Sequence, residues 1–255
     1  EEYEPSSEYD SSFALQIFAA REAVFKILAK ESLSIHEKLI VILDMGSKIQ
    51  QCINTDEYDN IKSVVNDYLK EGIAHTLDET RNLSDSGQFE DISLQQGIRQ
   101  ILYPYEEMEV LNPEWEVILK DIIDSLFEQM SDEEYNILNE EFGTYMVSRA
   151  YEYRQLLEYL VFRYFAKSIY DYDFLGKCQM LVTNFFVIRQ MDIIRWLDNH
   201  REYSFKDRMD VVHIFSRQVE YSEDNIENLY EDFIFDDIFK TDSLIAILWI
   251  DSENI

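Results

Sequence analysis

Residues 174–200 read FLGKCQMLVTNFFVIRQMDIIRWLDNH and are apolar on almost every side of a helical projection. The main apolar stripe repeats at the three- and four-residue spacing of an α-helix and consists of Leu181, Phe185, Ile188 and Trp196. A helix without a polar face has to be covered by neighbours on all sides. This segment therefore predicts a helix in the core of a multi-helix protein.

The preceding residues, 145–173, read YMVSRAYEYRQLLEYLVFRYFAKSIYDYD and hold seven of the 17 tyrosines. Their apolar positions also follow helical spacing, in a stripe of Tyr153, Leu156, Leu157, Leu160, Val161, Tyr164 and Phe165. Tyr151 and Phe162 fall on the opposite face. Because two faces are apolar, we expect this helix to lie at the centre of the fold rather than on its surface.

The composition indicates a globular protein built from helices. The 255 residues are 46% hydrophobic and 14% aromatic, which is enough to bury a substantial core. Only six Gly and three Pro occur, too few for the turns of a β-sandwich or barrel, and there is no glycine fingerprint of a nucleotide-binding unit. We predict an all-α multi-helix bundle of about nine to ten helices.

The chain divides into a short tail and one long helical region. Residues 1–12 are acidic and lack an apolar repeat, which is typical of a tail or a linker remnant. Residues 13–250 predict a single helical domain, with two subdomains divided near residues 82–91 as the alternative. A helix predicted over residues 92–110 is interrupted at Pro104, because proline removes a backbone donor and clashes with the preceding turn.

Serine residues mark several helix starts. An acidic residue three positions after a serine forms a capping box, in which each residue bonds the other's backbone. The sequence contains such pairs at Ser34 with Glu37, Ser131 with Glu134 and Ser204 with Asp207, and a further serine cap at Ser222. We expect a helix to follow each of them, and a last apolar helix over residues 244–250 to close the core.

The net charge is −30, from 52 acidic and 22 basic residues. Such a surface repels phosphate backbones and anionic lipid headgroups, so nucleic-acid and membrane-surface binding are not expected. Residues 149–217 differ from the rest, with 11 basic and nine acidic residues. Acidic residues elsewhere either keep exposed helix faces soluble or form a docking surface for a basic partner.

The two cysteines indicate neither a disulfide framework nor a zinc site. Cys52 and Cys178 are far apart in apolar helical contexts, which fits a reducing cytoplasm. Residues 178–197 are long enough to suggest a membrane span, but their polar and charged residues exclude a lipid-facing helix. The chain begins at Glu1 and has no signal peptide, so we expect a fragment or a trimmed product.

No catalytic signature is present. The sequence lacks a P-loop, a GxGxxG motif, an HExxH motif, a GxSxG motif and the paired ExxH motifs of a di-iron bundle. Its four histidines, His36, His75, His200 and His213, are scattered, so each is read as a surface residue or a satisfied buried one, and no metal site is predicted. The catalytic residues are not identifiable from motifs.

Charged residues in the apolar helices are the best candidates for a polar centre. Asp192 is three residues from both Arg189 and Arg195, and Arg217 is three residues from Glu220. This spacing places each pair on one helix face. The pairs either tie helices together, or leave one guanidinium uncompensated to hold a carboxylate of a cofactor or an acidic group of another module. The candidate aromatic wall of that centre is Tyr153, Tyr164 and Trp196.

Three successive segments resemble one known family. They are EYRQLLEYLVFRYFAKSIYDYDF at 152–174, VTNFFVIRQMDIIRWL at 182–197 and VVHIFSRQVEYSEDNIENL at 211–229. They are similar to the C-terminal helical region of the bacterial flagellin lysine-N-methylase family, with its YLVxRYF helix and SRxxEHSxxN turn. The N-terminal hairpin, FAAREAVFKILAKESLSIHEKLIVIL, is similar to the helices that follow that family's cysteine-rich module. Tyr221 stands where the family usually has histidine.

The resemblance implies methyl transfer from S-adenosylmethionine to lysine side chains of flagellin, in the cytoplasm before export. It also implies an iron–sulfur cluster in a cysteine-rich module, which is absent from these 255 residues and would precede them. We therefore expect a helical domain with no cofactor of its own that is inactive alone and works with that module. The alternative is a non-catalytic helical interaction domain whose acidic surface docks a basic protein.

Overall fold

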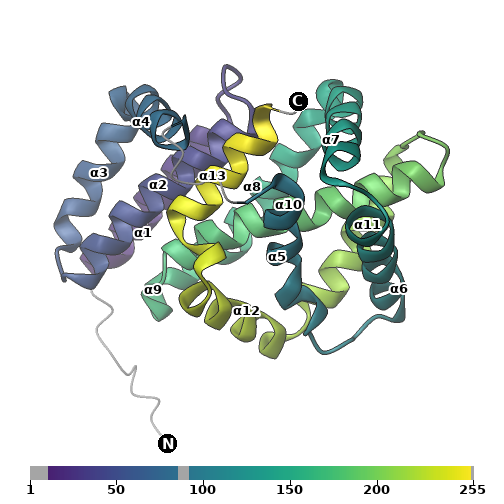
Figure 1. Ribbon diagram of the computed structural model, residues 1–255. Coiled ribbons are helices and arrows are strands. Elements are labelled where there is room, and N and C mark those ends of the chain that lie inside the picture. Colours follow the sequence, from purple (N-terminus) through teal and green to yellow (C-terminus); the bar gives the residue numbers. More distant parts are fainter. Residues whose placement is uncertain (1–10, 86–91, 254–255) are drawn as a thin grey trace, which may run out of the picture.

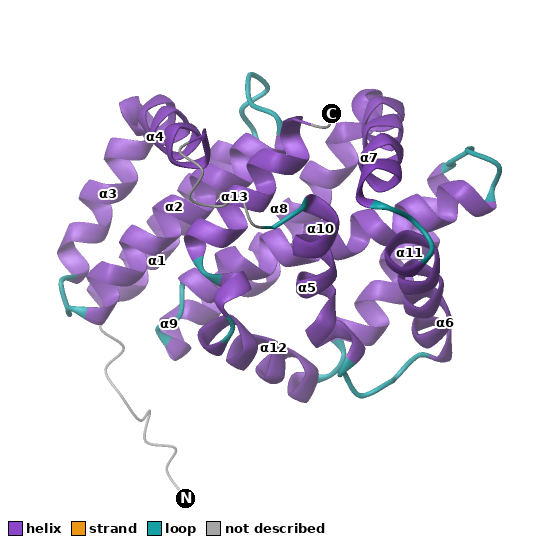
Figure 2. Ribbon diagram, in the orientation of Figure 1, coloured by secondary structure: helices purple, strands orange, loops and turns teal. Residues whose placement is uncertain are grey.

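The computed structural model describes residues 11–85 and 92–253, and every regular element in these ranges is helical (Figures 1 and 2). The predicted all-α multi-helix fold is confirmed. Its α-helices are α1 Ser11–Leu28, α2 Ile35–Asn54, α3 Ile61–Asp67, α4 Ile73–Asp85, α5 Leu94–Glu106, α6 Pro113–Ile122, α7 Asp132–Met146, α8 Ala150–Tyr164, α9 Ser168–Asp171, α10 Leu175–Asp198, α11 Phe205–Phe215, α12 Glu223–Phe235 and α13 Thr241–Glu253.

The predicted helix starts at the four serines are confirmed. Ser34, Ser131 and Ser204 each form a complete capping box, at the start of α2, α7 and α11. Ser222 accepts a hydrogen bond from the backbone of Asn225 at the start of α12. These side chains satisfy backbone N–H groups that have no partner within the helix. Local sequence chemistry therefore sets where these four helices begin.

Helix α10 lies in the middle of the molecule (Figure 1) and contacts α2, α5, α6, α8, α11, α12 and α13. Its residues are almost all buried, including the four residues of the stripe that predicts it. The prediction of a core helix over this segment is confirmed. None of the described helices is long and apolar enough to cross a membrane.

Helix α8 does not lie at the centre of the fold, and the expectation that both its faces would be covered is wrong. Its main apolar stripe is buried, but Tyr151 and Phe162 on the opposite face are 51% and 69% exposed. Helix α1 covers part of α8, and Arg21 of α1 lies over the ring of Phe162, 5.2 Å from its centroid. A cation over an aromatic face gives an exposed ring a polar neighbour, so an aromatic residue at helical spacing does not need a covered face.

Several helices continue through short turns of different pitch. π-helical turns follow α3, α6 and α11, as η2 Tyr68–Gly72, η3 Ile123–Glu128 and η6 Ser216–Glu220. 3-10 turns are η1 Tyr58–Asn60, η4 Val147–Arg149, η5 Phe165–Lys167 and η7 Asp237–Phe239. Such turns rotate the residues after them relative to the residues before. They therefore change which side chains of a continuous apolar run face the core.

The predicted interruption at Pro104 does not occur. Helix α5 includes this residue and ends two residues later, at Glu106. Proline deprives the carbonyl of Gln100 of its helical partner, and Gln100 is an exposed residue. The steric cost falls in the last turn, where the helix is about to end.

The predicted tail and subdomain boundary fall largely outside the described residues. Residues 1–10 and 86–91 are not described, and α1 begins at Ser11. The first part of the predicted boundary, residues 82–85, continues helix α4. Helix α4 contacts α2 and α13, and α13 also contacts α2 and α5. Helices from both sides of residues 86–91 therefore pack against one another.

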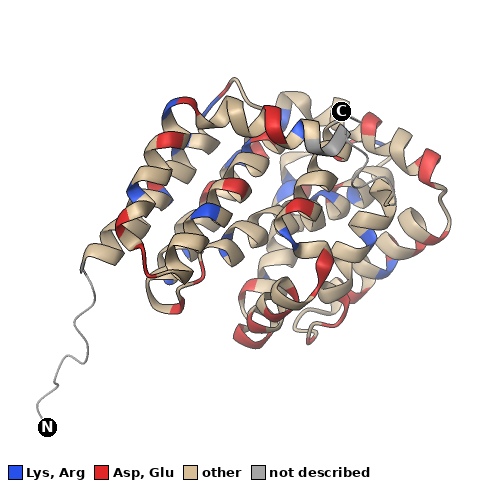
Figure 3. Ribbon diagram, turned by 60° about the vertical axis from the view of Figure 1, so that its left-hand side comes forward, with Lys and Arg blue, Asp and Glu red and all other residues tan. Residues whose placement is uncertain are grey.

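Acidic residues are spread over the peripheral helices on all sides that Figure 3 shows. They do not gather on one face in this view. This distribution fits the interpretation that most of the −30 charge solvates exposed helix faces.

Helices α2 and α10 approach closely at Gly46. A Cβ atom on residue 46 would lie 2.5 Å from Sγ and 3.2 Å from Cβ of Cys178. Both residues are buried, and Cys178 is a free thiol whose pKa burial raises well above the ordinary value. Glycine at 46 is therefore required by the contact between the two helices rather than by its backbone conformation.

We expect Gly46→Ala to lower the free energy of unfolding by roughly 1–3 kcal/mol through overpacking. Cys178→Ala alone leaves a small cavity and costs about 1 kcal/mol. The double variant should be less destabilised than the sum of the two, because the new methyl group occupies the space of the missing sulfur. Urea denaturation of all four proteins measures this coupling, and strictly additive changes would show that the two positions do not touch.

Candidate functional site

The side chain of Asp192 is fully buried between α10, α8 and α11 and accepts three hydrogen bonds. Tyr153 of α8 donates to Oδ2 at 2.6 Å, and Nη1 of Arg208 on α11 donates to the same oxygen at 2.6 Å. Tyr203, from the loop before α11, donates to Oδ1. Both carboxylate oxygens therefore have partners, and the partners come from three separate segments.

This network continues to a second carboxylate. Glu152 accepts from Arg208 Nε at 3.1 Å and from Arg149 Nε at 2.7 Å, and Arg149 also donates to the backbone oxygen of Tyr203. Two guanidinium groups thus balance two carboxylates, Glu152 and Asp192. Charge balance of this kind is what allows ionised groups to remain buried.

The pKa shifts in this network keep the hydrogen-bond donors protonated. Burial raises the pKa of the Asp192 carboxyl, while Arg208 and the two tyrosine hydroxyls oppose that rise. Burial works against the charge of Arg208, but the Asp192 carboxylate together with Tyr153 and Tyr203 outweighs burial and raises the pKa of Arg208. Burial and the Asp192 charge together raise the pKa of Tyr153 and Tyr203. The tyrosines therefore act as neutral donors.

A second buried carboxylate, Asp251 of α13, lies on another side of α10. It accepts from His36 Nε2 at 2.7 Å and from Asn139 Nδ2 at 2.5 Å, and Arg189 Nε lies 3.8 Å from it. Burial by itself raises the pKa of Asp251, but Arg189 and His36 outweigh burial and the pKa falls to about 2. Asp251 therefore remains charged at neutral pH.

The buried polar residues do not pair as their spacing predicts. Asp192 pairs with Arg208 and not with Arg189 or Arg195, and Arg189 lies beside Asp251. Glu220 pairs with Arg163 at 2.9 Å, and not with Arg217. Spacing of three residues places two side chains near one face of a helix, but in a helix covered on all sides each polar residue finds a partner on whichever neighbour lies closest.

The predicted polar centre is therefore divided between buried and open positions. Arg189, Asp192 and Glu220 are buried, whereas Arg195 is partly exposed and Arg217 is exposed. Arg195 and Arg217 both line an open groove. The structure thus places the five predicted residues in four different environments: beside Arg208, beside Asp251, beside Arg163 and in the groove.

The three aromatic residues of the predicted wall are buried but do not form one wall. Tyr153 hydrogen-bonds to Asp192, and Tyr164 donates to Glu220 at 3.3 Å. Trp196 packs against Phe142 and Tyr145, with ring centroids 5.5 and 5.6 Å apart. Each aromatic residue therefore belongs to a separate part of the core.

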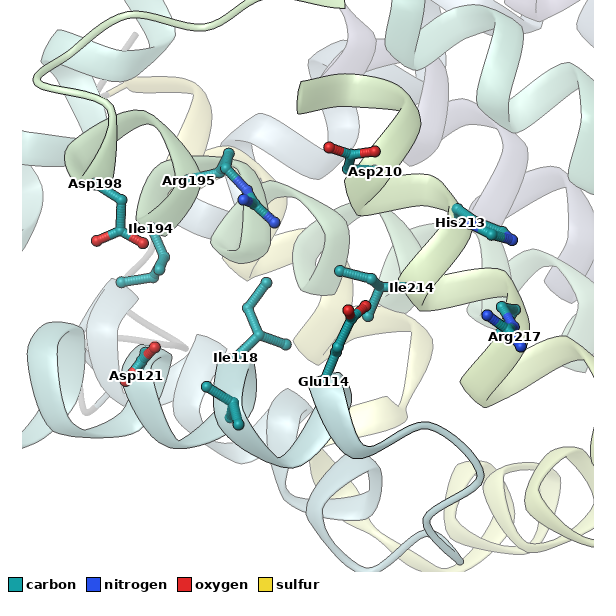
Figure 4. Close-up of a pocket in the computed structure, with 11 residues that line it drawn as sticks. Glu114, Ile118, Asp121, Ile194, Arg195, Asp198, Asp210, His213, Ile214 and Arg217 are labelled. Atoms are coloured by element: carbon teal, nitrogen blue, oxygen red, sulfur yellow. The ribbon is translucent and has the colours of Figure 1, made fainter. Parts of the chain in front are cut away.

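An open groove of about 650 Å³ lies between α6, the end of α10, and α11 with η6 (Figure 4). Glu114 and Ile118 of α6 project toward Ile214 of α11 in this view. The other residues that line the groove are Val117, Asp121, Ile194, Arg195, Asp198, Asp210, His213 and Arg217. Four carboxylates and two guanidinium groups give the groove a formal charge of −2, with an apolar floor of buried isoleucines.

Sequence reasoning did not find the charged partners of the buried charged residues. Asp251, Arg208, Glu152 and Arg163 belong to helices whose charged residues look like ordinary surface positions. His36 follows the cap of α2 and is buried by Phe185, with the ring centroids 5.4 Å apart. The one available signal was that a charged residue inside an apolar helix requires a partner. Within the described residues, no three His, Cys, Asp or Glu side chains are grouped as metal ligands.

The sequence matches the FliB lysine N-methylase C-terminal domain over residues 21–247. The chain belongs to this family. The matched region runs from α1 into α13 and includes α10, both sides of the groove and the Asp192 network. No curated protein and no solved structure matches the chain. The family is therefore known from the sequence, whereas the roles of the buried networks and the groove have to be argued from their geometry.

We expect Asp192→Ala to lower the free energy of unfolding by roughly 3–5 kcal/mol, because the substitution leaves Arg208 buried without its closest counter-charge. Asp198→Ala, at an exposed position on the same helix, should change it by less than about 0.5 kcal/mol. Urea denaturation followed by circular dichroism measures both. Equal stability of the two variants would contradict the buried charge network.

The depressed pKa of Asp251 makes part of the stability depend on pH. A carboxyl whose folded pKa is below its unfolded value stabilises the fold above the unfolded pKa, and that contribution is lost as the pH falls through the folded pKa. We therefore expect the stability advantage of the parent over Asp251→Asn, about 2 kcal/mol from this source at neutral pH, to shrink between pH 4 and pH 2. A pH-independent difference in denaturant unfolding would show that Asp251 has an ordinary pKa.

Proposed function

We propose that this chain is the helical domain of a protein-lysine N-methyltransferase that acts on flagellin, and that the groove between α6, α10 and α11 receives the lysine-bearing segment. Membership of the lysine N-methylase family supports the reaction class. The observation that carries the assignment of the groove is its combination of an apolar floor with acidic walls.

A lysine side chain has two parts that this groove would accommodate separately. Its aliphatic stem packs on apolar surface while its ammonium head remains near water or a carboxylate. Ile118, Ile194 and Ile214 are 7%, 5% and 8% exposed and form the apolar floor. Asp198 and Asp210 approach from α10 and α11, and Glu114 and Asp121 approach from α6.

The charged residues of the groove are open to a binding partner. The ion pairs formed among the described residues involve other side chains, so the four groove carboxylates are not neutralised by a close basic residue. Arg195 and Arg217 supply donors for a carboxylate or a backbone carbonyl of the bound segment. The net charge of −30 favours approach of basic segments over long distances, in a manner that salt weakens.

The proposed reaction needs a methyl donor and an iron–sulfur cluster, but we do not assign either group to the residues of this chain. S-adenosylmethionine would supply the methyl group, in the cytoplasm before flagellin is exported. The chain's two cysteines, Cys52 and Cys178, do not fit an iron–sulfur cluster, which requires three or four thiolates. The proposal therefore places the cluster in a separate cysteine-rich module, and gives this domain the task of binding the substrate.

The test is methylation of purified flagellin by the full-length enzyme, with radiolabelled S-adenosylmethionine. We expect the double variant Asp121→Lys with Asp198→Lys to raise the KM for flagellin about tenfold or more, because two repulsive charges replace two attractive ones at about 1 kcal/mol or less each. The matched control, Glu71→Lys with Glu231→Lys, makes the same change in net charge at exposed sites on other helices and should leave the KM nearly unchanged.

Three outcomes separate the alternatives. An unchanged KM in the groove variant would remove the groove from substrate binding while leaving the family activity intact. Equal effects of both variants would indicate general electrostatic steering rather than a site. Flagellin bound but not methylated by the full-length protein would favour the non-catalytic interaction domain.

A further inference from the structure

A second cavity, of about 260 Å³, lies between α2, α7, α8 and α10. Ser34, Val147 and Ala150 are exposed and form its outer end. Phe185 and Arg189 of α10 are 1% and 2% exposed and form its inner end. The cavity therefore extends from the surface to the central helix, away from the groove that is lined by the C-terminal end of α10.

The lining of this cavity is apolar and contains no carboxylate. Its remaining wall residues are Ile35, His36, Phe142, Gly143, Met146 and Tyr153. Phe142, Tyr153 and Phe185 present aromatic surface, which suits edge-to-face packing with another ring. In a protein of net charge −30, the absence of acidic residues from the eleven lining positions is a marked local departure.

Arg189 is the only arginine or lysine among the lining residues, and its donors are incompletely used. Nη2 donates to the backbone oxygen of Asn139 at 3.3 Å, and Nε is 3.8 Å from Asp251, beyond hydrogen-bond distance. Nη1 is buried and has no hydrogen-bond partner within residues 11–85 and 92–253. A buried donor without an acceptor is costly, and more so on a charged group.

The nearby carboxylate does not relieve this deficit. Asp251 already accepts short hydrogen bonds from His36 and Asn139. Its charge stabilises Arg189 from 3.8 Å without occupying the guanidinium fork. Arginine donors match a carboxylate in geometry, and such a pair is strongest where water is excluded.

We propose that this cavity binds a small organic monocarboxylate with an aromatic body, whose carboxylate pairs with the guanidinium of Arg189 at the inner end and whose ring lies among Phe142, Tyr153 and Phe185. An apolar cavity of about 150 Å³ is sufficient to bind benzene. The 260 Å³ found here therefore has room for a ring and a short acid arm. The site is separate from the proposed lysine groove and does not depend on it.

The probe is 3-phenylpropionate, and its neutral isostere 3-phenylpropionamide is the matched ligand. Titration of the full-length protein by isothermal calorimetry should show one site that binds the acid about 10- to 100-fold more tightly than the amide, because a hydrogen bond to a charged donor exceeds a neutral one by that factor. Added salt should not weaken the binding of the acid, because the pair of its carboxylate with Arg189 is shielded from solvent. If added salt abolishes the binding of the acid, the binding site consists of exposed lysines or arginines instead.

Two sets of variants locate the site. Arg189→Lys keeps the charge beside Asp251 but loses the planar fork, so it should weaken the acid about tenfold while the amide, which reports an intact cavity, is unaffected. Ala150→Trp should close the outer end and abolish binding of both ligands. Ser148→Trp, at an exposed neighbouring position that does not line the cavity, should leave binding intact.

The proposal is overturned if acid and amide bind equally, if neither binds, or if Ser148→Trp and Ala150→Trp behave alike. Loss of amide binding in Arg189→Lys would show that the cavity has collapsed in this variant. The relative affinity of the parent protein for the acid and the amide then decides whether the proposal holds.

Discussion

A buried carboxylate has to be surrounded by donors, and Asp192 on α10 imposes this requirement on the centre of the molecule. Its three donors come from α8, from the loop before α11 and from α11 itself. Arg208 then links Asp192 to Glu152, and Glu152 links to Arg149. Because each of these segments must present its donor in one place, the network fixes the position of α8 and α11 around α10 more narrowly than apolar packing would.

The charged residues of α10 contact different neighbouring helices. These contacts position the residues that line the groove and the cavity. Asp192 connects α10 to α8 and α11, whereas Arg189 connects it to α7 and α13. Tyr153 and Arg189, one from each network, both line the apolar cavity. The end of α10 contributes Ile194 and Arg195 to the open groove. The hydrogen bonds of Tyr153 and Arg189 hold these wall side chains in place before any ligand arrives, which lowers the entropy cost of binding.

Sequence periodicity was sufficient for the fold class, for α10 as a core helix and for the four serine-capped helix starts, because these depend on neighbours along the chain. It was insufficient for α8, whose Phe162 is exposed beneath Arg21 of a distant helix. The same limit applies to the polar centre. Spacing gives the direction in which Arg189 and Asp192 leave the helix, but their partners, Asp251 and Arg208, are brought near only by the tertiary fold. That one guanidinium is left uncompensated stays a prediction; Nη1 of Arg189 has no hydrogen-bond partner among the described residues, but Asp251 lies 3.8 Å from its Nε.

The groove and the cavity are proposed to bind ligands of opposite charge within one strongly acidic protein, and the charges nearest to each site explain how both are compatible. Arg189 and Arg195 are six residues apart on α10, or about 9 Å along a helix axis. This is close to the Debye length of roughly 8 Å at physiological salt, so solvent screens the exposed groove charges from the cavity in part, and the buried Arg189 is screened less than they are. At long range the charge of −30 favours basic partners and repels anions. At the inner end of the cavity, however, the nearest charges are Arg189 and Asp251, and the charged Asp251 carboxylate already accepts hydrogen bonds from His36 and Asn139. The local, desolvated interaction therefore sets the sign of the preferred ligand there, while the global charge governs only how fast that ligand arrives.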